Sequence, residues 1–114
     1  MNIRMSEEAI RFRIDQSELL ELKQKGEIVS EVFLPGNKIF RYSVVLDTEE
    51  VAPLNLCLKN EVLVLCLNAE ALEEISVMPP TRDGVSVSQD MAVGKTLTCS
   101  LEVDVRKAKK VKDE

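Results

Sequence analysis

The chain has 114 residues, of which 15 are basic and 20 acidic, giving a formal net charge of −5. This length is typical of one domain, and 45 % hydrophobic with 31 % charged residues indicates a soluble globular protein. The sequence contains no histidine, which excludes histidine bases and histidine-ligated metal centres. It contains no tryptophan and only 4 % aromatic residues, which removes most stacking surface for single-stranded nucleic acid.

The charge is unevenly distributed. Residues 106–114 carry five basic and two acidic groups, whereas the other 105 residues carry ten basic and eighteen acidic groups. An acidic body repels phosphates, so we expect no nucleic-acid partner. The longest apolar run, Val62 to Leu67, is far too short to cross a membrane, and no signal sequence is evident. We therefore expect a cytoplasmic protein with no membrane association, in which three cysteines are reduced thiols: Cys57, Cys66 and Cys99.

The first third of the chain predicts two short strands and a helix. Ile3 and Met5 alternate with polar residues, and residues 10–14 are apolar at every second position, the period of a half-buried strand. Asp15-x-x-Glu18 has the spacing of a capping box, which predicts a helix beginning there. Gly26, preceded by lysines, marks its end.

Two hairpins are predicted next. Residues 27–34 and 39–46 flank Pro35-Gly36-Asn37-Lys38, and a four-residue loop places Phe33 opposite Phe40 and Val29 opposite Val44. Residues 54–59 and 62–67 turn at Asn60-Glu61, which gathers six leucines on one face. That register makes Cys57 and Cys66 diagonal neighbours, too far apart for an unstrained disulfide.

The last third predicts a short helix and a long strand. Asn68 caps a helix over residues 69–75, and Pro79-Pro80 prevents its continuation. Residues 85–88 form a short strand. From Thr96 to Val105 apolar residues alternate with polar ones, which predicts a strand with one face in the core.

These elements predict one α+β domain over residues 1–105, followed by a charged tail over 106–114. Each half, 3–46 and 54–105, reads as hairpin, helix, hairpin, which indicates an internal pseudo-repeat. The expected architecture is a mainly antiparallel sheet that could curl toward a barrel, covered by two short helices.

Charged residues on the first and last strands are the candidate site. Several arginines on one sheet face could bind a phosphorylated or carboxylated molecule, and acidic residues at alternate strand positions could hold Mg²⁺. If the terminal strands are neighbours, these groups could instead pair with one another on a solvated face. The candidate ligand-binding residues are Arg4, Arg11, Arg13, Glu102 and Asp104.

Two other features fit structural roles better. Gly94-Lys95-Thr96 matches the last three residues of a phosphate-binding loop motif. That motif also needs a glycine at position 89, which is glutamine here, and it should open a helix rather than a strand, so we expect a hairpin turn. Cys99 alternates with Leu97 and Leu101, which indicates a small core residue rather than a nucleophile.

The opening Ile3-Arg4, residues 10–14 and Ser17-Glu18 resemble an uncharacterised family of small bacterial proteins with an I-R…I-R-x-R…S-E opening. The region from Gly94 through residues 101–105 is also similar, although Val103 replaces a lysine and a mid-sequence tryptophan is missing. The resemblance implies a compact bacterial cytosolic domain and no known activity.

A weaker similarity links Arg11-x-Arg13 and Glu102-x-Asp104-x-Arg106 to the triphosphate tunnel enzymes, which line an antiparallel barrel with alternating charges. That family places its acidic motif at the N-terminus and uses a longer chain with more inward charges.

Two functions therefore stay open. The favoured one is a small non-catalytic binding domain, without a cofactor or metal, whose partner is another protein or a second copy. The alternative is a Mg-dependent enzyme or sensor for a phosphorylated small molecule, using the charged strand faces.

Overall fold

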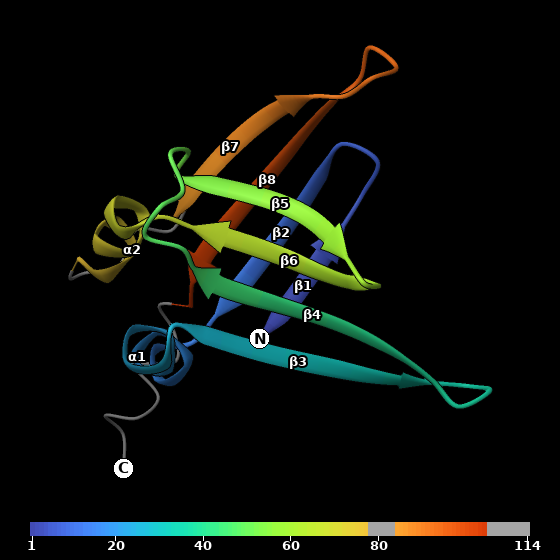
Figure 1. The fold of residues 1–114 in the computed structure, drawn as a ribbon, viewed down its shortest axis with the longest axis horizontal. Helices are drawn as coiled ribbons and strands as arrows, with labels where there is room; N and C mark the ends of the chain where they lie inside the picture. The colour runs from blue at the N-terminus through green and yellow to red at the C-terminus, as the bar shows by residue number, and fades with distance from the viewer. Residues whose placement is uncertain (78–83, 105–114) are drawn as a thin grey trace.

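Two four-stranded sheets are stacked in layers in this computed structural model, which describes residues 1–77 and 84–104. Sheet A, in the order β1-β2-β8-β7, lies behind sheet B, in the order β3-β4-β6-β5, and their strands cross at a steep angle (Figure 1). Both helices lie at the same end of the stack (Figure 1). The elements are β1 (Asn2–Met5), β2 (Ala9–Ile14), α1 (Gln16–Lys25), β3 (Glu27–Leu34), β4 (Lys38–Leu46), β5 (Leu54–Lys59), β6 (Val62–Leu67), α2 (Ala69–Ser76), β7 (Val85–Asp90) and β8 (Thr96–Val103).

The two halves of the chain exchange hairpins. Hairpin β1–β2 pairs with hairpin β7–β8 of the second half, and hairpin β5–β6 pairs with hairpin β3–β4 of the first. The two strand pairings that join the halves, β2 with β8 and β4 with β6, are parallel, while all four hairpins are antiparallel. The counterparts in the two halves are β1 and β5, β2 and β6, β3 and β7, and β4 and β8. Exchanging every strand of sheet A for its counterpart gives the order β5-β6-β4-β3, which is sheet B read from its other edge. The predicted α+β fold and pseudo-repeat are confirmed.

Residue registers show equivalences that are not evident in the sequence. Ser100 pairs with Arg11 in β2, and Ser43 pairs with Val64 in β6; both serines are buried. Asp104 donates its backbone N–H to Ile14, just as Asp47 donates to Leu67, at 2.7 and 2.9 Å. The pseudo-repeat therefore retains identical residues at matched positions: Asn2 with Asn55, Ser43 with Ser100, and Asp47 with Asp104.

The core fills the space between the sheets. Phe12 of β2 and Leu101 of β8 are fully buried, as strand alternation predicts. Phe12 meets Tyr42 of sheet B edge to face, with ring centroids 6.3 Å apart, an arrangement that stabilises aromatic pairs. The helices close one end of this core with Leu19 and Leu22 from α1 and Ala71 and Ile75 from α2.

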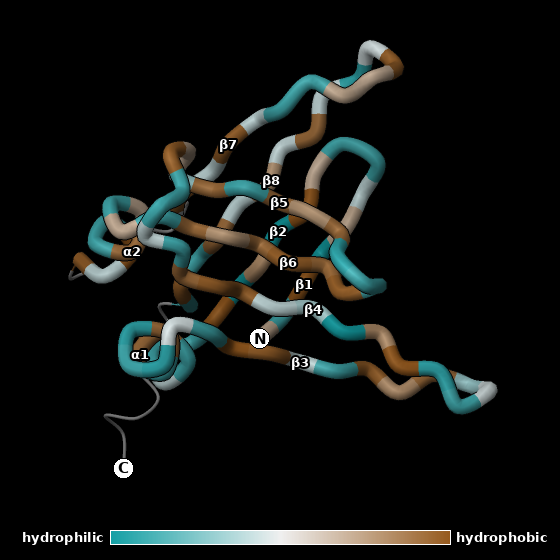
Figure 2. Tube along the Cα trace, in the orientation of Figure 1, coloured by the Kyte–Doolittle hydropathy of each residue, from teal (hydrophilic) through white to brown (hydrophobic). Residues whose placement is uncertain are grey.

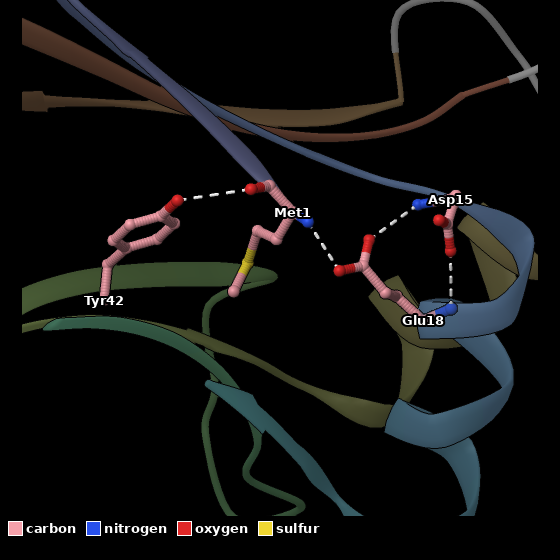
Figure 3. Close-up of polar contacts among 4 residues, drawn as sticks. All are labelled: Met1, Asp15, Glu18 and Tyr42. Atoms are coloured by element: carbon pink, nitrogen blue, oxygen red, sulfur yellow. Dashed lines mark hydrogen bonds and ion pairs between the residues drawn. The ribbon is translucent and has the colours of Figure 1, made fainter. Parts of the chain in front are cut away.

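The predicted start of α1 is confirmed. Asp15 accepts a hydrogen bond from the Glu18 N–H at 2.8 Å, and the Glu18 side chain accepts one from the Asp15 N–H at 3.0 Å. The second Glu18 oxygen pairs with the Met1 ammonium, while the Tyr42 hydroxyl donates to the Met1 carbonyl (Figure 3). One carboxylate thus ties α1 to the start of β1, beside the core aromatics. α2 is capped by Asn68, as expected.

The predicted register of the β3–β4 hairpin is wrong by one residue. Leu34 pairs with Lys38, leaving a three-residue turn instead of four, because Gly36 and Asn37 both adopt positive φ. Phe33 therefore lies opposite Ile39, and Ile28 replaces Val29 opposite Val44. Since side chains alternate between faces, the shift of one residue turns Val29 and Phe33 outward.

Other expectations hold within the described residues. The leucines of β5 and β6 share the core face, with only Leu58 exposed at the tip, and Cys57 and Cys66 are diagonal. Gly94 lies in the β7–β8 turn, as expected.

The expectation that the sheet curls toward a barrel is wrong, since the strands form two separate sheets. Pro79-Pro80, Val105 and the tail lie outside the described residues, so the boundary at residue 105 stays a prediction.

We predict that Gly84→Ala destabilises the fold by about 3 kcal/mol or more. Gly84 has a φ of +63°, and a Cβ there would lie 2.0 Å from the Leu101 carbonyl oxygen of β8. Gly94→Ala is the control, because Gly94 also has positive φ but nothing lies within 4 Å of the added Cβ. It should cost only about 1 kcal/mol. Urea unfolding measures both; equal losses would contradict the close approach.

Candidate functional site

The outer face of sheet A gathers most of the charged residues that the sequence singled out. Arg4 lies directly opposite Arg11 across β1 and β2, and Arg13 follows on the same face. They line a hollow of about 210 Å³ together with Asn2, Ile3 and Glu102. We call this hollow the arginine hollow. Four of the five predicted site residues therefore come together, because β2 and β8 are neighbours.

Asp104 does not line the arginine hollow. It follows the last residue of β8 and lies where its amide hydrogen-bonds to Ile14, at the end of the strand pair. Alternation along a strand would place Asp104 on the same face as Glu102, but β8 ends at Val103, so the alternation does not extend to Asp104.

The charges of the arginine hollow are only partly paired. Arg13 forms an ion pair with Glu102 at 3.3 Å, and the Glu102 side chain is only 12 % exposed. Neither Arg4 nor Arg11 forms an ion pair with any residue that the structure describes. Like charges directly opposite on a sheet repel, so this face holds uncompensated positive charge on an acidic protein.

The expected Mg²⁺ arrangement has no geometric support. Glu102 is engaged by Arg13, and Asp104 is outside the hollow. Within residues 1–77 and 84–104, no three acidic or cysteine side chains cluster in a way that could hold a metal ion.

The outer face of sheet B carries a second, larger hollow of about 580 Å³, which sequence reasoning missed. Val45, Val62, Val64 and Cys66 form its half-buried apolar floor. Charged residues at its margin are Glu27, Asp47, Glu49 and Lys59. We call this feature the valine trough.

The valine trough and the arginine hollow occupy equivalent positions of the pseudo-repeat. The registers match Arg11 with Val64 and Arg13 with Cys66, while Arg4 matches Cys57. The same backbone framework therefore presents guanidinium groups on one sheet and aliphatic groups on the other.

Beyond the valine trough, the tip of hairpin β3–β4 protrudes from the stack (Figure 1). Every residue from 31 to 39 is exposed, and we call residues 31–41 the arm. Hydrophobic stretches continue along it (Figure 2), with Phe33 74 % exposed. Val29 and Ile39, also exposed, share the outward face with Phe33. Sequence reasoning missed that apolar face because it placed this hairpin in the wrong register.

All three cysteines are free thiols. Burial raises the pKa of Cys99, which lies in the core. Burial is also the main cause that raises the pKa of Cys66, followed by the neighbouring Cys57, Asp47 and Glu50. Since the thiolate is the nucleophile, both environments suppress reactivity.

A comparison with protein-family models gives a match that covers the whole chain. A family of unknown function, DUF7009, matches residues 1–114. The chain belongs to this family. No curated protein and no solved structure matches the chain significantly. Membership in DUF7009 confirms the expected kinship with a family of unknown function and assigns no activity. Among the helices of the described residues, none is long and apolar enough to span a membrane.

We predict that Cys66 and Cys99 resist alkylation in the folded protein. At pH 7.5 a raised pKa leaves less thiolate, so iodoacetamide should label Cys66 more slowly than a short unstructured cysteine peptide and leave Cys99 almost unlabelled. Peptide mass spectrometry after timed quenching measures the rates, with urea-unfolded protein as the control. A folded Cys66 faster than the peptide would show an activated thiol.

Proposed function

We propose that this domain is a non-catalytic binding module that associates with a second copy of itself, the arm of each copy lying in the valine trough of the other. The observation that carries the proposal is that two apolar features, the arm and the valine trough, lie on the outer face of sheet B. The equivalent face of sheet A is polar, so the fold itself does not demand these side chains.

The two features are chemically suited to each other. The arm offers a large aromatic side chain, Phe33, beside Ile39, and aromatic anchors in apolar pockets dominate binding energies. The trough offers a half-buried aliphatic floor of several valines. A monomer in water would leave both exposed, at a cost that grows with apolar area.

Charges at the two features also have complementary signs. The arm carries Lys38 and Arg41 against one acid, Glu31, which already pairs with Arg41 at 2.6 Å. The margin of the trough carries three acids against Lys59. The arm therefore has a net positive charge and the margin of the trough a net negative one. This difference favours contact between an arm and a trough over contact between two arms.

A two-fold axis makes the exchange reciprocal. Each copy has one arm and one trough, so two identical contacts close the assembly without leaving a free arm. Strand β3 is moreover an eight-residue edge strand of sheet B, and no other strand of residues 1–77 and 84–104 pairs with its outer side. Contact along it would cover that edge as well.

We extend the proposal to a cytoplasmic location. Its support is the set of three unpaired cysteines, since reduced thiols persist in the cytosol.

We predict that the chain dimerises and that Phe33→Asp or Val64→Lys weakens the dimer at least about tenfold, since a hot-spot loss of about 2 kcal/mol suffices. The first variant puts a charge on the arm and the second puts one in the trough. Sedimentation velocity over a concentration series measures the dissociation constants. Val93→Asp, on the exposed turn after β7, is the control and should dimerise normally.

Mixing the two variants tests the reciprocal arrangement. In a mixed dimer one contact is native, and the other joins the aspartate introduced on the arm to the lysine introduced in the trough. These two side chains have opposite charges, so equimolar mixing should restore dimers. A strict monomer at every concentration would refute self-association. Dimers that survive both substitutions would place the interface elsewhere.

A further inference from the structure

We propose that the arginine hollow is a binding site for a phosphate group, as inorganic phosphate or as the terminal group of a small phosphomonoester. The site lies on sheet A and is independent of the association proposed for sheet B. Its ligand is defined by chemistry: a tetrahedral oxyanion with two negative charges.

The strongest sign is the pairing of Arg4 with Arg11. Their Cα atoms are direct cross-strand partners, which brings two positive side chains onto adjacent positions of one face. Neither has an ionic partner among the residues described. An arrangement that costs stability without a ligand becomes favourable when an anion lies between the two guanidinium groups.

The third arginine is held in position. The ion pair with Glu102 at 3.3 Å directs Arg13 along the same face, and Glu102 is largely buried. Glu102 lies opposite Arg13 in the strand register, whereas Arg4 lies opposite Arg11, two positions along β2. A carboxylate repels an anion, so the anion would bind beside Arg4 and Arg11. That restriction favours a compact ligand over a polyanion.

The number of unpaired positive charges in the arginine hollow favours a ligand with two negative charges. Subtracting the Arg13–Glu102 pair leaves two guanidinium groups, which one doubly charged phosphate neutralises and a monocarboxylate does not. Guanidinium forks donate pairs of hydrogen bonds to phosphate oxygens, and about 210 Å³ of space accommodates a small anion. The acidic body of the chain disfavours a nucleic-acid backbone as the source of the phosphate.

The pseudo-repeat shows that the fold does not need these arginines. Their counterparts in sheet B are Cys57, Val64 and Cys66, on an equivalent backbone. Arg13 has its partner in Glu102, whereas Arg4 and Arg11 have no ionic partner among the described residues, and an anion supplies that interaction.

Titration of the full chain with inorganic phosphate tests the proposal. At constant ionic strength, ¹⁵N–¹H spectra should shift for amides of β1, β2 and β8 around the hollow. Arg4→Gln and Arg11→Gln should each weaken phosphate binding about tenfold, as expected for losing a charge-assisted hydrogen bond. Lys23→Gln is the matched control and should bind phosphate normally, because Lys23 is an exposed cation on α1 that lies outside the arginine hollow, the arm and the valine trough.

Two further measurements separate ligand binding from a structural role. Without phosphate and at low salt, Arg11→Gln should unfold at the same or a higher temperature than the natural chain, because a repulsion is relieved; Arg4→Lys, which keeps the charge, should retain weaker binding. Chloride and succinate are the comparison anions. Shifts equal to those with chloride, undiminished binding by Arg4→Gln and Arg11→Gln, or succinate binding as tightly as phosphate would each overturn the proposal.

Discussion

Parallel pairing of β2 with β8 and of β4 with β6 is the constraint on which the rest of the structure depends. Each pairing joins strands from opposite halves of the chain, so neither sheet can form until both halves have folded against each other. The pairing also brings Arg13 beside Glu102, 89 residues apart in sequence. Core packing of Phe12 against Tyr42 then links the two sheets across the layer between them.

The pseudo-repeat gives this protein two versions of one framework. Matched serines and aspartates persist at the central strand pairs, and both helices begin at a side chain that caps the backbone. The outward positions have diverged: guanidinium groups on sheet A, aliphatic groups on sheet B. Matched core positions also differ, as Phe12 and Leu65 do, but both remain apolar and buried. Because outward side chains do not take part in the packing between the sheets, one core can carry two chemically different outer faces.

Much of the fold could be predicted because it depends on interactions between residues close together in the sequence. The helix at Asp15 and Glu18 follows from hydrogen bonds within one turn, and the leucine register of β5–β6 follows from a two-residue turn. The arginine set was also recoverable, since alternation in β2 places Arg11 and Arg13 on one face. Asp104 lies outside the arginine hollow because a strand's alternation stops where the strand stops. The apolar face of the arm was missed because it depends on a register set by one turn residue. The valine trough was missed because it forms only where β4 pairs with β6, two strands from different hairpins.

The sequence by itself determined the secondary structure, the inward face of most strands and the absence of histidine chemistry, since these depend on composition and on neighbours along the chain. Only the tertiary structure decided which hairpins become partners, that two separate sheets form instead of a barrel, and that one outer face is cationic and the other apolar. Those outcomes depend on contacts between halves, whose energies arise from packing and burial that no local pattern encodes.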